Sequence, residues 1–242
     1  MRDNDLRTYF ENIKKPWGQL FYKVVWEQLS FIVNSKVLDF GSGFGITANH
    51  LAKNNDVVAI EPNADMVMMR IEENKYNQII GGIEELRCFK DSSFDYVVCH
   101  NVLEYAKERK DILKEFCRVI KPNGIISIVK HNRAGRIMQK AIFENNLDEA
   151  ISIINSETMD TISFGRINYY ELTHIIEWVD PISIHIDKVL GIRTFWGLQQ
   201  NNEIKYNKAW QEKMFKLEMK VSDIDDFIKI SFFNHILFRK VF

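Results

Sequence analysis

Short apolar runs alternate with amphipathic segments along most of this 242-residue chain. Four apolar runs predict buried strands, at residues 37–40, 56–60, within 91–105, and at 125–129. Segments with helical spacing separate these runs, as a parallel sheet built by crossover connections requires. The pattern therefore predicts a doubly wound α/β fold with a mostly parallel sheet and helices on both faces.

Other segments look like additions to this sheet within a single domain spanning residues 1–242. Residues 1–35 predict a helical extension with an apolar face formed by Phe21, Val24, Val25, Leu29 and Ile32. Residues 131–175 are long for a connection and predict an inserted lid at the carboxyl edge of the sheet, with a helix near 137–143. The last strands are expected at 182–189 and 228–238, as a hairpin-like pair at the sheet edge.

A glycine-rich turn follows the first strand, with the sequence Gly41, Ser42, Gly43, Phe44, Gly45. Alternating glycines let the backbone turn tightly and let a ligand approach it closely. Asp39, just before the turn, would repel a pyrophosphate but suits a cationic amino-acid group. Nicotinamide sites favour a small residue where this chain has Ile46. A NAD(P)-dependent oxidoreductase is therefore disfavoured and kept only as an alternative.

Glu61 ends the second strand, about 20 residues after Asp39. A carboxylate at this position can accept hydrogen bonds from both hydroxyls of a ribose. Because Pro62 follows, Glu61 also suits the acidic start of a helix. The glycine turn before it favours the ribose interpretation.

The order of these features resembles the class I S-adenosylmethionine (SAM) methyltransferases. The resemblance implies their Rossmann-like fold with a seven-stranded sheet, and SAM as the cofactor, converted to S-adenosyl-L-homocysteine. Further motifs are Gly18-Gln19-Leu20 with Trp26, His100-x-Val102-Leu103-Glu104-Tyr105, Asn132-x-x-Gly135 and Gly191-Ile192-Arg193-x-Phe195. Together they resemble the tRNA carboxymethoxyuridine methyltransferases, which esterify the carboxylate of a modified wobble uridine. This narrower resemblance implies tRNA as a partner.

The resemblance also implies a set of cofactor contacts. The predicted cofactor-binding residues are Asp39, Gly41, Ser42, Gly43, Gly45, Glu61, Pro62, Ile83, Glu84 and His100. The chain departs from the family at two places, one at a cofactor contact and one around the acceptor pocket. Phe21 stands where the family has an arginine that touches SAM, and His131 to Gly135 replace the family's Tyr-Asn-Ala-His-Gly.

Methyl transfer from a sulfonium requires mainly that the reacting atoms be aligned, so the sequence predicts no metal. A carboxylate acceptor is ionised at neutral pH and needs a cation to hold it rather than a general base. We expect Arg193 to be that cation, with Arg133 as a second candidate, although Arg193 also suits an ordinary surface position. His100 could be a general base for a hydroxyl or amine acceptor, but a positional role beside the cofactor is preferred.

The net charge of −1 gives no general argument for nucleic-acid binding. The lysine-rich stretch at 205–220 is expected to be a solvated helix face. Trp17 and Trp196 could stack on a base or pack in the core or lid. A small-molecule O- or N-methyltransferase and a non-catalytic SAM-binding protein therefore remain alternatives.

Three cysteines, Cys88, Cys99 and Cys117, lie in apolar segments without a CxxC pair. They are expected to be buried thiols in a reducing compartment. The start of the chain has no apolar signal core, and no apolar run approaches 18 residues. We therefore expect a cytoplasmic protein with no membrane partner; its oligomeric state is not evident from the sequence.

Overall fold

The computed structural model describes residues 3–155, 158–161, 165–179 and 184–241. The chain forms two compact units. The first unit contains Met1–Gln28, Lys130–Tyr169 and Val189–His235. The second unit contains Leu29–Val129, Tyr170–Lys188 and Ile236–Phe242.

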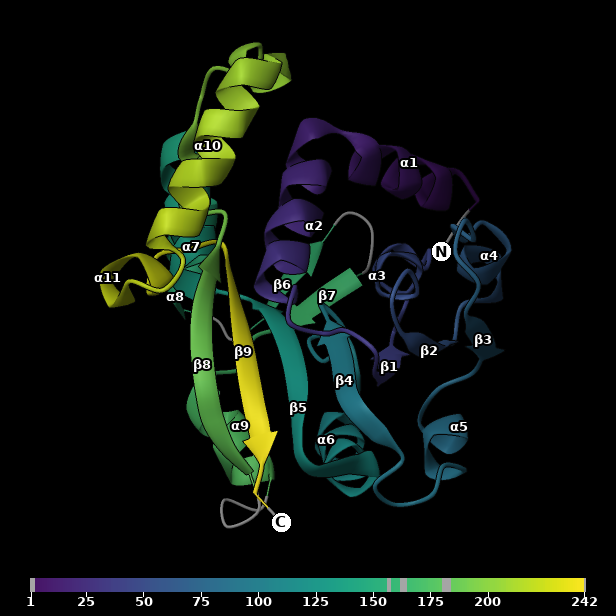
Figure 1. The fold of residues 1–242 in the computed structure, drawn as a ribbon. Helices are drawn as coiled ribbons and strands as arrows, with labels where there is room; N and C mark the ends of the chain where they lie inside the picture. Colours follow the sequence, from purple (N-terminus) through teal and green to yellow (C-terminus); the bar gives the residue numbers. More distant parts are fainter. Residues whose placement is uncertain (1–2, 156–157, 162–164, 180–183, 242) are drawn as a thin grey trace. The chain divides into compact units, whose positions relative to one another are not determined.

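A seven-stranded sheet is the framework of the second unit (Figure 1). Its strands are β1 Lys36–Phe40, β2 Asp56–Glu61, β3 Asn77–Ile80, β4 Phe94–His100, β5 Ile120–His131, β8 Ile184–Ile192 and β9 Phe233–Lys240. Their order is β3-β2-β1-β4-β5-β9-β8, and the pairs from β3 to β5 are parallel. The mostly parallel α/β fold predicted from the sequence is confirmed.

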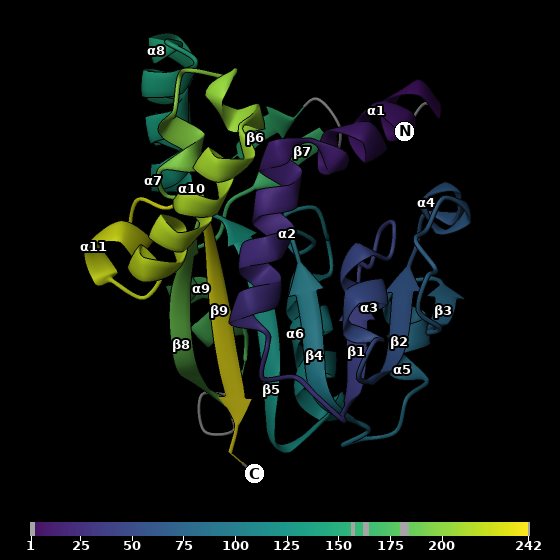
Figure 2. The ribbon, with the colours of Figure 1, turned by 45° about the horizontal axis from the view of Figure 1, so that its top comes forward.

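The interior strand β1 is buried because it has neighbours on both sides and apolar side chains on both faces. Leu38 lies opposite Val58 of β2 and Val97 of β4, and all three side chains are buried. Figure 2 shows β2 and β4 pointing the same way, on either side of β1. The carboxyl ends of these strands therefore meet at one edge of the sheet.

Five helices accompany the sheet among the described residues of the second unit. They are α3 Ile46–Leu51, α4 Ala64–Met68, α5 Ile83–Arg87, α6 Arg109–Val119 and α9 Leu172–Trp178. The face of α6 that is buried carries Ile112, Leu113, Phe116 and Val119, which recur with helical spacing. Phe116 meets Phe40 of β1 edge to face, with ring centroids 5.3 Å apart. This packing fixes α6 against the centre of the sheet.

The first unit is mainly helical. Its elements are α1 Asp3–Lys14, α2 Pro16–Gln28, α7 Arg133–Met138, the π-helical turn η1 Gln139–Phe143, α8 Leu147–Asn155, the strands β6 Thr158–Thr161 and β7 Gly165–Asn168, the 3-10 turns η2 Trp196–Leu198 and η3 Ile204–Tyr206, α10 Lys208–Val221 and α11 Asp225–Ile228. The helix predicted near 137–143 is confirmed by α7 and η1. The antiparallel pair β6 and β7 was not predicted. The action of residues 131–175 as a lid stays a prediction.

Helix α2 is shorter than the apolar pattern of residues 21–32 predicts. It begins at Pro16, a residue that suits the first turn of a helix because it lacks an N–H. It ends at Gln28, so Leu29 and Ile32 lie beyond it, although both are buried. The apolar spacing continued past the helix because the following turn also faces a core.

The last two strands are neighbours at the edge of the sheet, but they are not a hairpin. Helices α10 and α11 lie between β8 and β9 in the chain. The prediction of a strand from residue 228 is wrong, because α11 extends to Ile228 and β9 begins at Phe233. Of the strand predicted at 182–189, residues 182–183 lie outside the described residues.

The segment Pro122-Asn123-Gly124 precedes the apolar run at 125–129. It lies within the bounds of β5, where the pairing register with β4 shifts between Phe94 and Tyr96. Asn123 has a φ of 63°, a left-handed conformation that asparagine tolerates. The chain therefore bulges here and continues as a strand.

Of the three cysteines, Cys99 is buried, Cys117 is intermediate and Cys88 is exposed. The prediction of burial is wrong for Cys88 because it caps the short helix α5, where its Sγ lies 3.3 Å from the carbonyl oxygen of Glu84. No helix in the described ranges combines the length and apolar character needed to cross a bilayer.

Candidate functional site

The glycine turn after β1 adopts a backbone that other residues rarely take. Gly41, Gly43 and Gly45 have φ angles of 76°, 55° and 69°. A Cβ at Gly41 would collide with the side chain of Val102, and one at Gly45 with the hydroxyl of Tyr76. All three positions therefore favour glycine for their backbone conformation, and Gly41 and Gly45 also require it for space.

Glu61, at the end of β2, braces this turn. One carboxylate oxygen, Oε2, accepts a hydrogen bond of 2.8 Å from the backbone N–H of Gly43. The other, Oε1, accepts one of 2.9 Å from the N–H of Asn63. Burial raises the pKa of Glu61, and these two hydrogen bonds oppose that shift. The sequence indicated Glu61 as a ligand-binding residue, but not that it also supports the glycine turn.

Asp39 lies in β1, directly before the turn, and is only 3 % exposed. Burial, and then the negative charge of Glu61, raise its pKa to about 7, although the N–H of Ala48 donates to its carboxyl group. Its Oδ2 is buried and has no hydrogen-bond partner among the residues that the structure describes. A buried carboxyl oxygen with no donor suits a cationic ligand group, which would compensate the cost of burial.

His100 ends β4 at the same edge of the sheet as Asp39 and Glu61. Its Nε2 lies 2.8 Å from Oγ of Ser127 in β5. This contact holds the ring between two neighbouring strands. It fits the positional role predicted for His100, although which nitrogen carries the proton depends on the tautomer.

The remaining predicted cofactor residues lie directly after β2 and at the start of α5. Ile83 and Glu84 begin α5, and the N–H of Gly81, just before it, donates to the carbonyl oxygen of Glu61 over 3.0 Å. Pro62 is exposed beyond Glu61. The structure thus brings the predicted cofactor residues of the second unit together along the carboxyl edge of β1, β2, β3 and β4.

Arg193 belongs to the first unit and follows β8 in a loop. Its φ of 60° is unusual for a residue other than glycine. Its Cζ lies 4.9 Å from the ring centroid of Phe232. The pKa of Arg193 is lowered to about 10, mainly by burial. The negative charge of Glu218 opposes this shift, and the positive charge of Arg136 adds to it. The Nε of Arg193 is buried and makes no hydrogen bond within the described part of the chain.

Arg136, on α7, contacts the same ring. Its Cζ lies 5.1 Å from the centroid of Phe232, and one of its terminal nitrogens donates to Oε1 of Gln139 over 3.0 Å. Its Nε is also buried without a partner in the described ranges. Two guanidinium groups with unused donors therefore share Phe232, and we name Arg136 and Arg193 the arginine pair.

Glu218, on α10, lies beside the arginine pair and is 1 % exposed. Its oxygens accept hydrogen bonds from three consecutive backbone N–H groups, those of Thr194 at 2.7 Å and of Phe195 and Trp196 at 2.9 Å each. Because backbone donors occupy this carboxylate, it fixes the loop that carries Arg193 and offers little hydrogen bonding to the arginine pair itself. Burial raises its pKa, while these three bonds and Arg193 oppose the shift.

Lys205 adds a further cation near the arginine pair. It is buried, which lowers its pKa to about 8, and the charge of Arg193 acts in the same direction. Its Nζ lies 3.1 Å from Oδ1 of Asn202 and 4.3 Å from the ring centroid of Phe143. Positive charge thus exceeds negative charge in this part of the first unit, which suits an anionic ligand.

Arg133, the second cation candidate, has a structural contact. It donates to the carbonyl oxygens of Ile153 and Ile154, at 2.9 and 2.5 Å, and so holds the end of α8. Asn132 likewise donates to the carbonyl oxygens of Ser231 and Lys229, at 2.7 and 2.9 Å. The Asn132-x-x-Gly135 motif therefore anchors α7, and the sequence gave no sign that Arg136 rather than Arg133 accompanies Arg193.

Two aromatic predictions are resolved in part. Trp196 is 1 % exposed and packs on Trp210 with ring centroids 5.0 Å apart, so the idea that it stacks on a base is wrong. Trp17 is half-buried, with Lys15 Nζ 5.2 Å from its ring centroid, and stacking of a base on it stays a prediction. Phe21, at the position of the family's arginine, packs against Phe233 at 4.9 Å.

Comparison with known proteins adds to this geometry. Residues 38–128, which include the glycine turn, Glu61 and His100, match the family described as a methyltransferase domain. The chain is a SAM-dependent methyltransferase. Its cofactor is SAM, and the buried carboxyl groups of Asp39 and Glu61 at the glycine turn fit its cationic amino-acid group and its ribose.

Two proteins similar to this methyltransferase act on different acceptors. It is 21 % identical to the tRNA 5-carboxymethoxyuridine methyltransferase of Escherichia coli O157:H7, over 92 % of this chain and 89 % of that protein. It is 28 % identical to the ubiquinone biosynthesis O-methyltransferase of Rickettsia canadensis, over 71 % of this chain and 73 % of that protein. The two names differ in acceptor but agree in methyl transfer.

Solved structures show the same fold. A possible histamine N-methyltransferase from Thermotoga maritima has a TM-score of 0.62 at 14 % identity, with 98 % of each chain covered. A complex between the Haloferax volcanii Trm112 methyltransferase activator and the putative methyltransferase also gives a TM-score of 0.62, at 15 % identity over 100 % of this chain and 99 % of that chain. At these identities the likeness supports the fold.

No group of three or more His, Cys, Asp or Glu side chains arranged to hold a metal ion occurs among the described residues.

Proposed function

We propose that the protein transfers the methyl group of SAM to a carboxylate oxygen of a modified wobble uridine in tRNA. The observation that carries this proposal is the arginine pair, Arg136 and Arg193, which shares the ring of Phe232 and has unused buried donors. The E. coli relative, which matches 92 % of this chain, is a tRNA 5-carboxymethoxyuridine methyltransferase, and this supports the same acceptor.

In this proposal the second unit binds SAM, which supplies an electrophilic methyl group. Asp39 holds the ammonium of the cofactor's amino-acid part, because its buried Oδ2 lacks another donor within the described part of the chain. Glu61 accepts from the ribose hydroxyls, since each of its oxygens keeps a lone pair after bonding one N–H.

The other cofactor residues shape the same site. Gly41, Ser42, Gly43 and Gly45 bring the backbone close to the ligand, because no Cβ intervenes at the glycines. Pro62, Ile83 and Glu84 line its approaches from the ends of β2 and α5, and His100 packs beside it at the end of β4.

The first unit binds the acceptor. A carboxylate is already ionised at neutral pH, so its oxygen can attack the methyl group without a general base. The fixed charge and planar donors of a guanidinium hold such a group in one orientation. Arg193 is the principal anchor and Arg136 the second one; Arg133 is occupied by the carbonyl groups at the end of α8.

A second candidate is O-methylation of a small hydroxyl-bearing molecule. It is favoured by the relatives named ubiquinone biosynthesis O-methyltransferase, which reach 28 % identity. A hydroxyl must lose its proton on attack, and His100, with Ser127 at 2.8 Å, would then be the candidate base. This function leaves the arginine pair without a use.

The test is methyl transfer from labelled SAM to total tRNA taken from cells that lack this protein. We expect label in one modified uridine, identified by mass spectrometry of the nucleosides. The label should be released by mild alkali, because an ester hydrolyses where a methyl ether or methylamine does not. Alkali-stable label, or no transfer to tRNA by protein that binds SAM, would contradict the proposed acceptor.

A further inference from the structure

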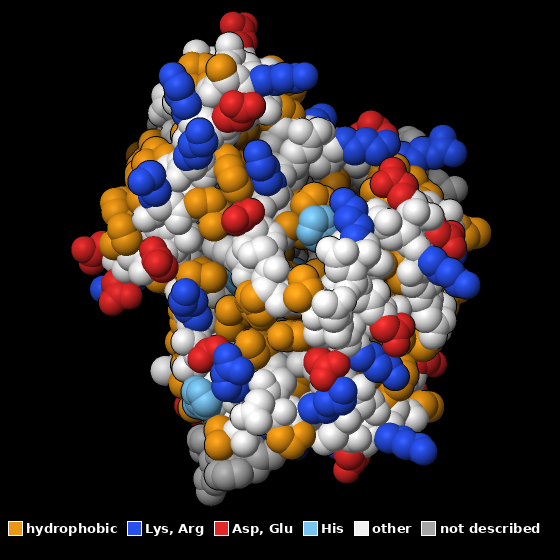
Figure 3. All heavy atoms as spheres, viewed as in Figure 1, with side chains coloured by type: hydrophobic (Ala, Val, Ile, Leu, Met, Phe, Trp, Pro, Cys, Tyr) orange, Lys and Arg blue, Asp and Glu red, His pale blue; other side chains and the backbone are white. Residues whose placement is uncertain are grey.

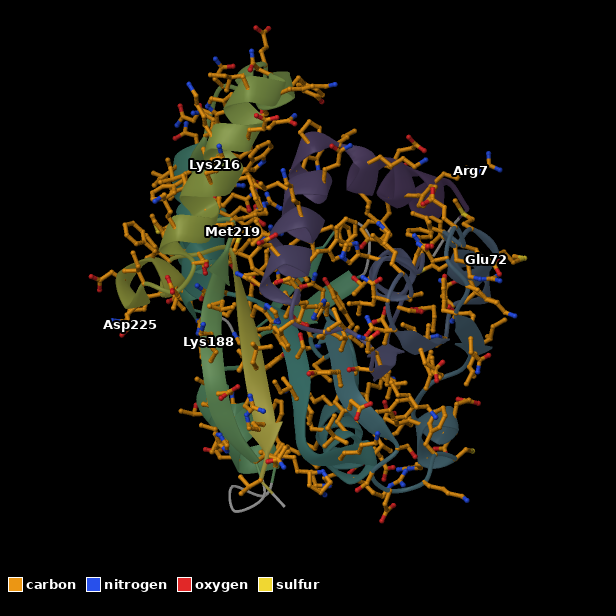
Figure 4. All side chains as sticks on the ribbon, in the orientation of Figure 1. Arg7, Glu72, Lys188, Lys216, Met219 and Asp225 are labelled. Atoms are coloured by element: carbon orange, nitrogen blue, oxygen red, sulfur yellow. The ribbon has the colours of Figure 1, made fainter. Side chains whose placement is uncertain are left out.

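One face of α10 carries a row of lysines that the proposed chemistry does not use. Lys208, Lys213, Lys216 and Lys220 fall within about 140° of arc around the helix axis, at 3.6 residues per turn. All four are exposed, and we name them the lysine face. Lys216 is labelled on this helix in Figure 4.

The charge of the lysine face is not neutralised by its neighbours. None of the four lysines forms an ion pair with another residue that the structure describes. Glu212 is the one acidic residue in the same arc of α10. Figure 3 shows Lys and Arg side chains gathered over this helix.

A fifth lysine adjoins the face from another helix. Lys23 of α2 is exposed, and its Nζ lies 4.3 Å from the ring centroid of Phe215, which flanks the lysine face on α10. Beyond the end of the helix the sign of the charge changes, because Asp223, Asp225 and Asp226 are exposed there. The positive surface therefore follows α10 and stops at α11.

The opposite side of α10 supports the acceptor site. Glu218 is buried there and holds the backbone of Thr194, Phe195 and Trp196, the residues that follow Arg193. Helix α10 thus presents a positive outer face, and its inner face fixes the loop that carries Arg193. The position of a polyanion bound along the outside of α10 would therefore be fixed relative to Arg193.

We infer that the lysine face is the docking surface for the phosphate backbone of the RNA acceptor. This inference rests on the proposed function, since it requires an RNA rather than a small-molecule acceptor. A row of exposed lysines binds phosphates without reading sequence. It gives the protein a way to hold tRNA while the arginine pair selects the carboxylate.

The test compares two variants that lose the same charge. In the first, Lys208, Lys213, Lys216 and Lys220 are all replaced by Gln. In the control, four exposed lysines of the second unit, Lys53, Lys75, Lys90 and Lys114, are replaced by Gln. The affinity of each for tRNA from cells lacking the protein is measured as a function of salt concentration. Circular dichroism and SAM affinity establish that each variant is folded.

We expect the lysine-face variant to bind tRNA at least tenfold more weakly than the control variant. The slope of log affinity against log salt should fall in magnitude by about 3 for four lost phosphate contacts. Methylation of the free carboxylate nucleoside at saturating concentration should be unchanged, because the lysine face touches only the RNA backbone.

Other outcomes overturn the inference in distinguishable ways. Equal tRNA affinity and slope in the two variants would exclude the lysine face, while methyl ester formation on tRNA by the unaltered protein would leave the proposed function standing. If the unaltered protein neither binds nor methylates tRNA, the proposed function fails together with the inference. Tighter binding of the lysine face to anionic lipid vesicles than to tRNA would assign the surface to a membrane instead.

Discussion

The two units of this methyltransferase contain sites of opposite charge. In the second unit the buried ionisable groups at the glycine turn are carboxyl groups, those of Asp39 and Glu61. In the first unit they are mainly cations, with Arg193 and Lys205 opposed by Glu218. Burial of a charge is costly unless a partner of opposite charge compensates it.

This difference in charge indicates what each site is suited to bind. The carboxyl groups suit the positive and hydroxyl-bearing parts of SAM, and the guanidinium groups suit an anionic acceptor. Each site also uses one carboxylate as a brace for its own backbone: Glu61 holds Gly43, and Glu218 holds Thr194 to Trp196. The braces differ in that Glu61 is also expected to contact the ligand.

The largest effect that separates the two sites is expected from Arg193→Ala. It should lower kcat/KM for the acceptor by about a hundredfold, as loss of one partner of a desolvated ion pair does, and leave SAM affinity within twofold. Steady-state kinetics and calorimetry with SAM measure the two quantities. Arg7→Ala, at an exposed arginine labelled in Figure 4, is the matched control. Equal losses of acceptor use and SAM affinity would mean that Arg193 supports the fold instead.

The converse effect is expected from Asp39→Asn and Glu61→Gln. Each should weaken SAM binding at least tenfold, because a buried carboxylate that meets the cofactor is neutralised. Binding of tRNA in the absence of SAM should not change. Glu72→Gln, at an exposed carboxylate paired with Arg70, serves as the control for loss of one negative charge. Unchanged SAM affinity in a folded Asp39 or Glu61 variant would overturn the cofactor assignment.

A smaller effect is expected from Glu218→Gln. An amide keeps one acceptor oxygen, so at least one of the three backbone N–H groups loses its partner and the Arg193 loop loosens. KM for the acceptor should rise about fivefold to tenfold with kcat and SAM affinity nearly constant. Glu27→Gln, at an exposed carboxyl group of α2 in the same unit, is the control. A lower melting temperature with unaltered KM would reduce Glu218 to a purely structural residue.

The smallest effect concerns pH and Asp39. Its pKa is raised from 3.8 to about 7 in the folded protein, so the folded state binds more protons than the unfolded state between these values. This group therefore makes the SAM-free protein less stable as pH rises from about 4 to about 7. Asp39→Asn removes the group, and its melting temperature should exceed that of the unaltered protein by several degrees at pH 8, with little difference at pH 4. A constant difference across this range would be inconsistent with the raised pKa.

Much of the second unit could be predicted because its signals are local. The strands β1, β2 and β4 are continuous apolar runs, and the glycine turn directly follows β1. Once parallel strands are assigned, their carboxyl ends must meet at one edge, so Asp39, Glu61 and His100 could be grouped before any contact was known. Errors occurred where the pattern was ambiguous, as at β9, where residues 228–232 are as apolar as a strand but are used for the end of α11 and a turn.

The first unit was less predictable because its contacts join distant segments. Arg193 was identified by resemblance, but Arg136 comes from α7, Phe232 from the turn before β9 and Glu218 from α10. Arg133 and Arg136 are both arginines of α7, and the chain gives no local sign of which one faces the carbonyl groups of α8. Which of the two arginines contacts these carbonyl groups depends on the side of α7 that each occupies.

By itself, the sequence determined the α/β fold of the sheet, the glycine turn and the choice of a SAM site over a nicotinamide site. These depend on the order of residues within short segments, which steric and hydrogen-bonding rules translate directly into structure. Only the tertiary structure decided that Arg136 accompanies Arg193, that Glu218 braces their loop, and that Lys205 is buried instead of exposed like the lysines of α10. Those facts depend on which faces of distant helices are buried together, and no local pattern in the chain records that choice.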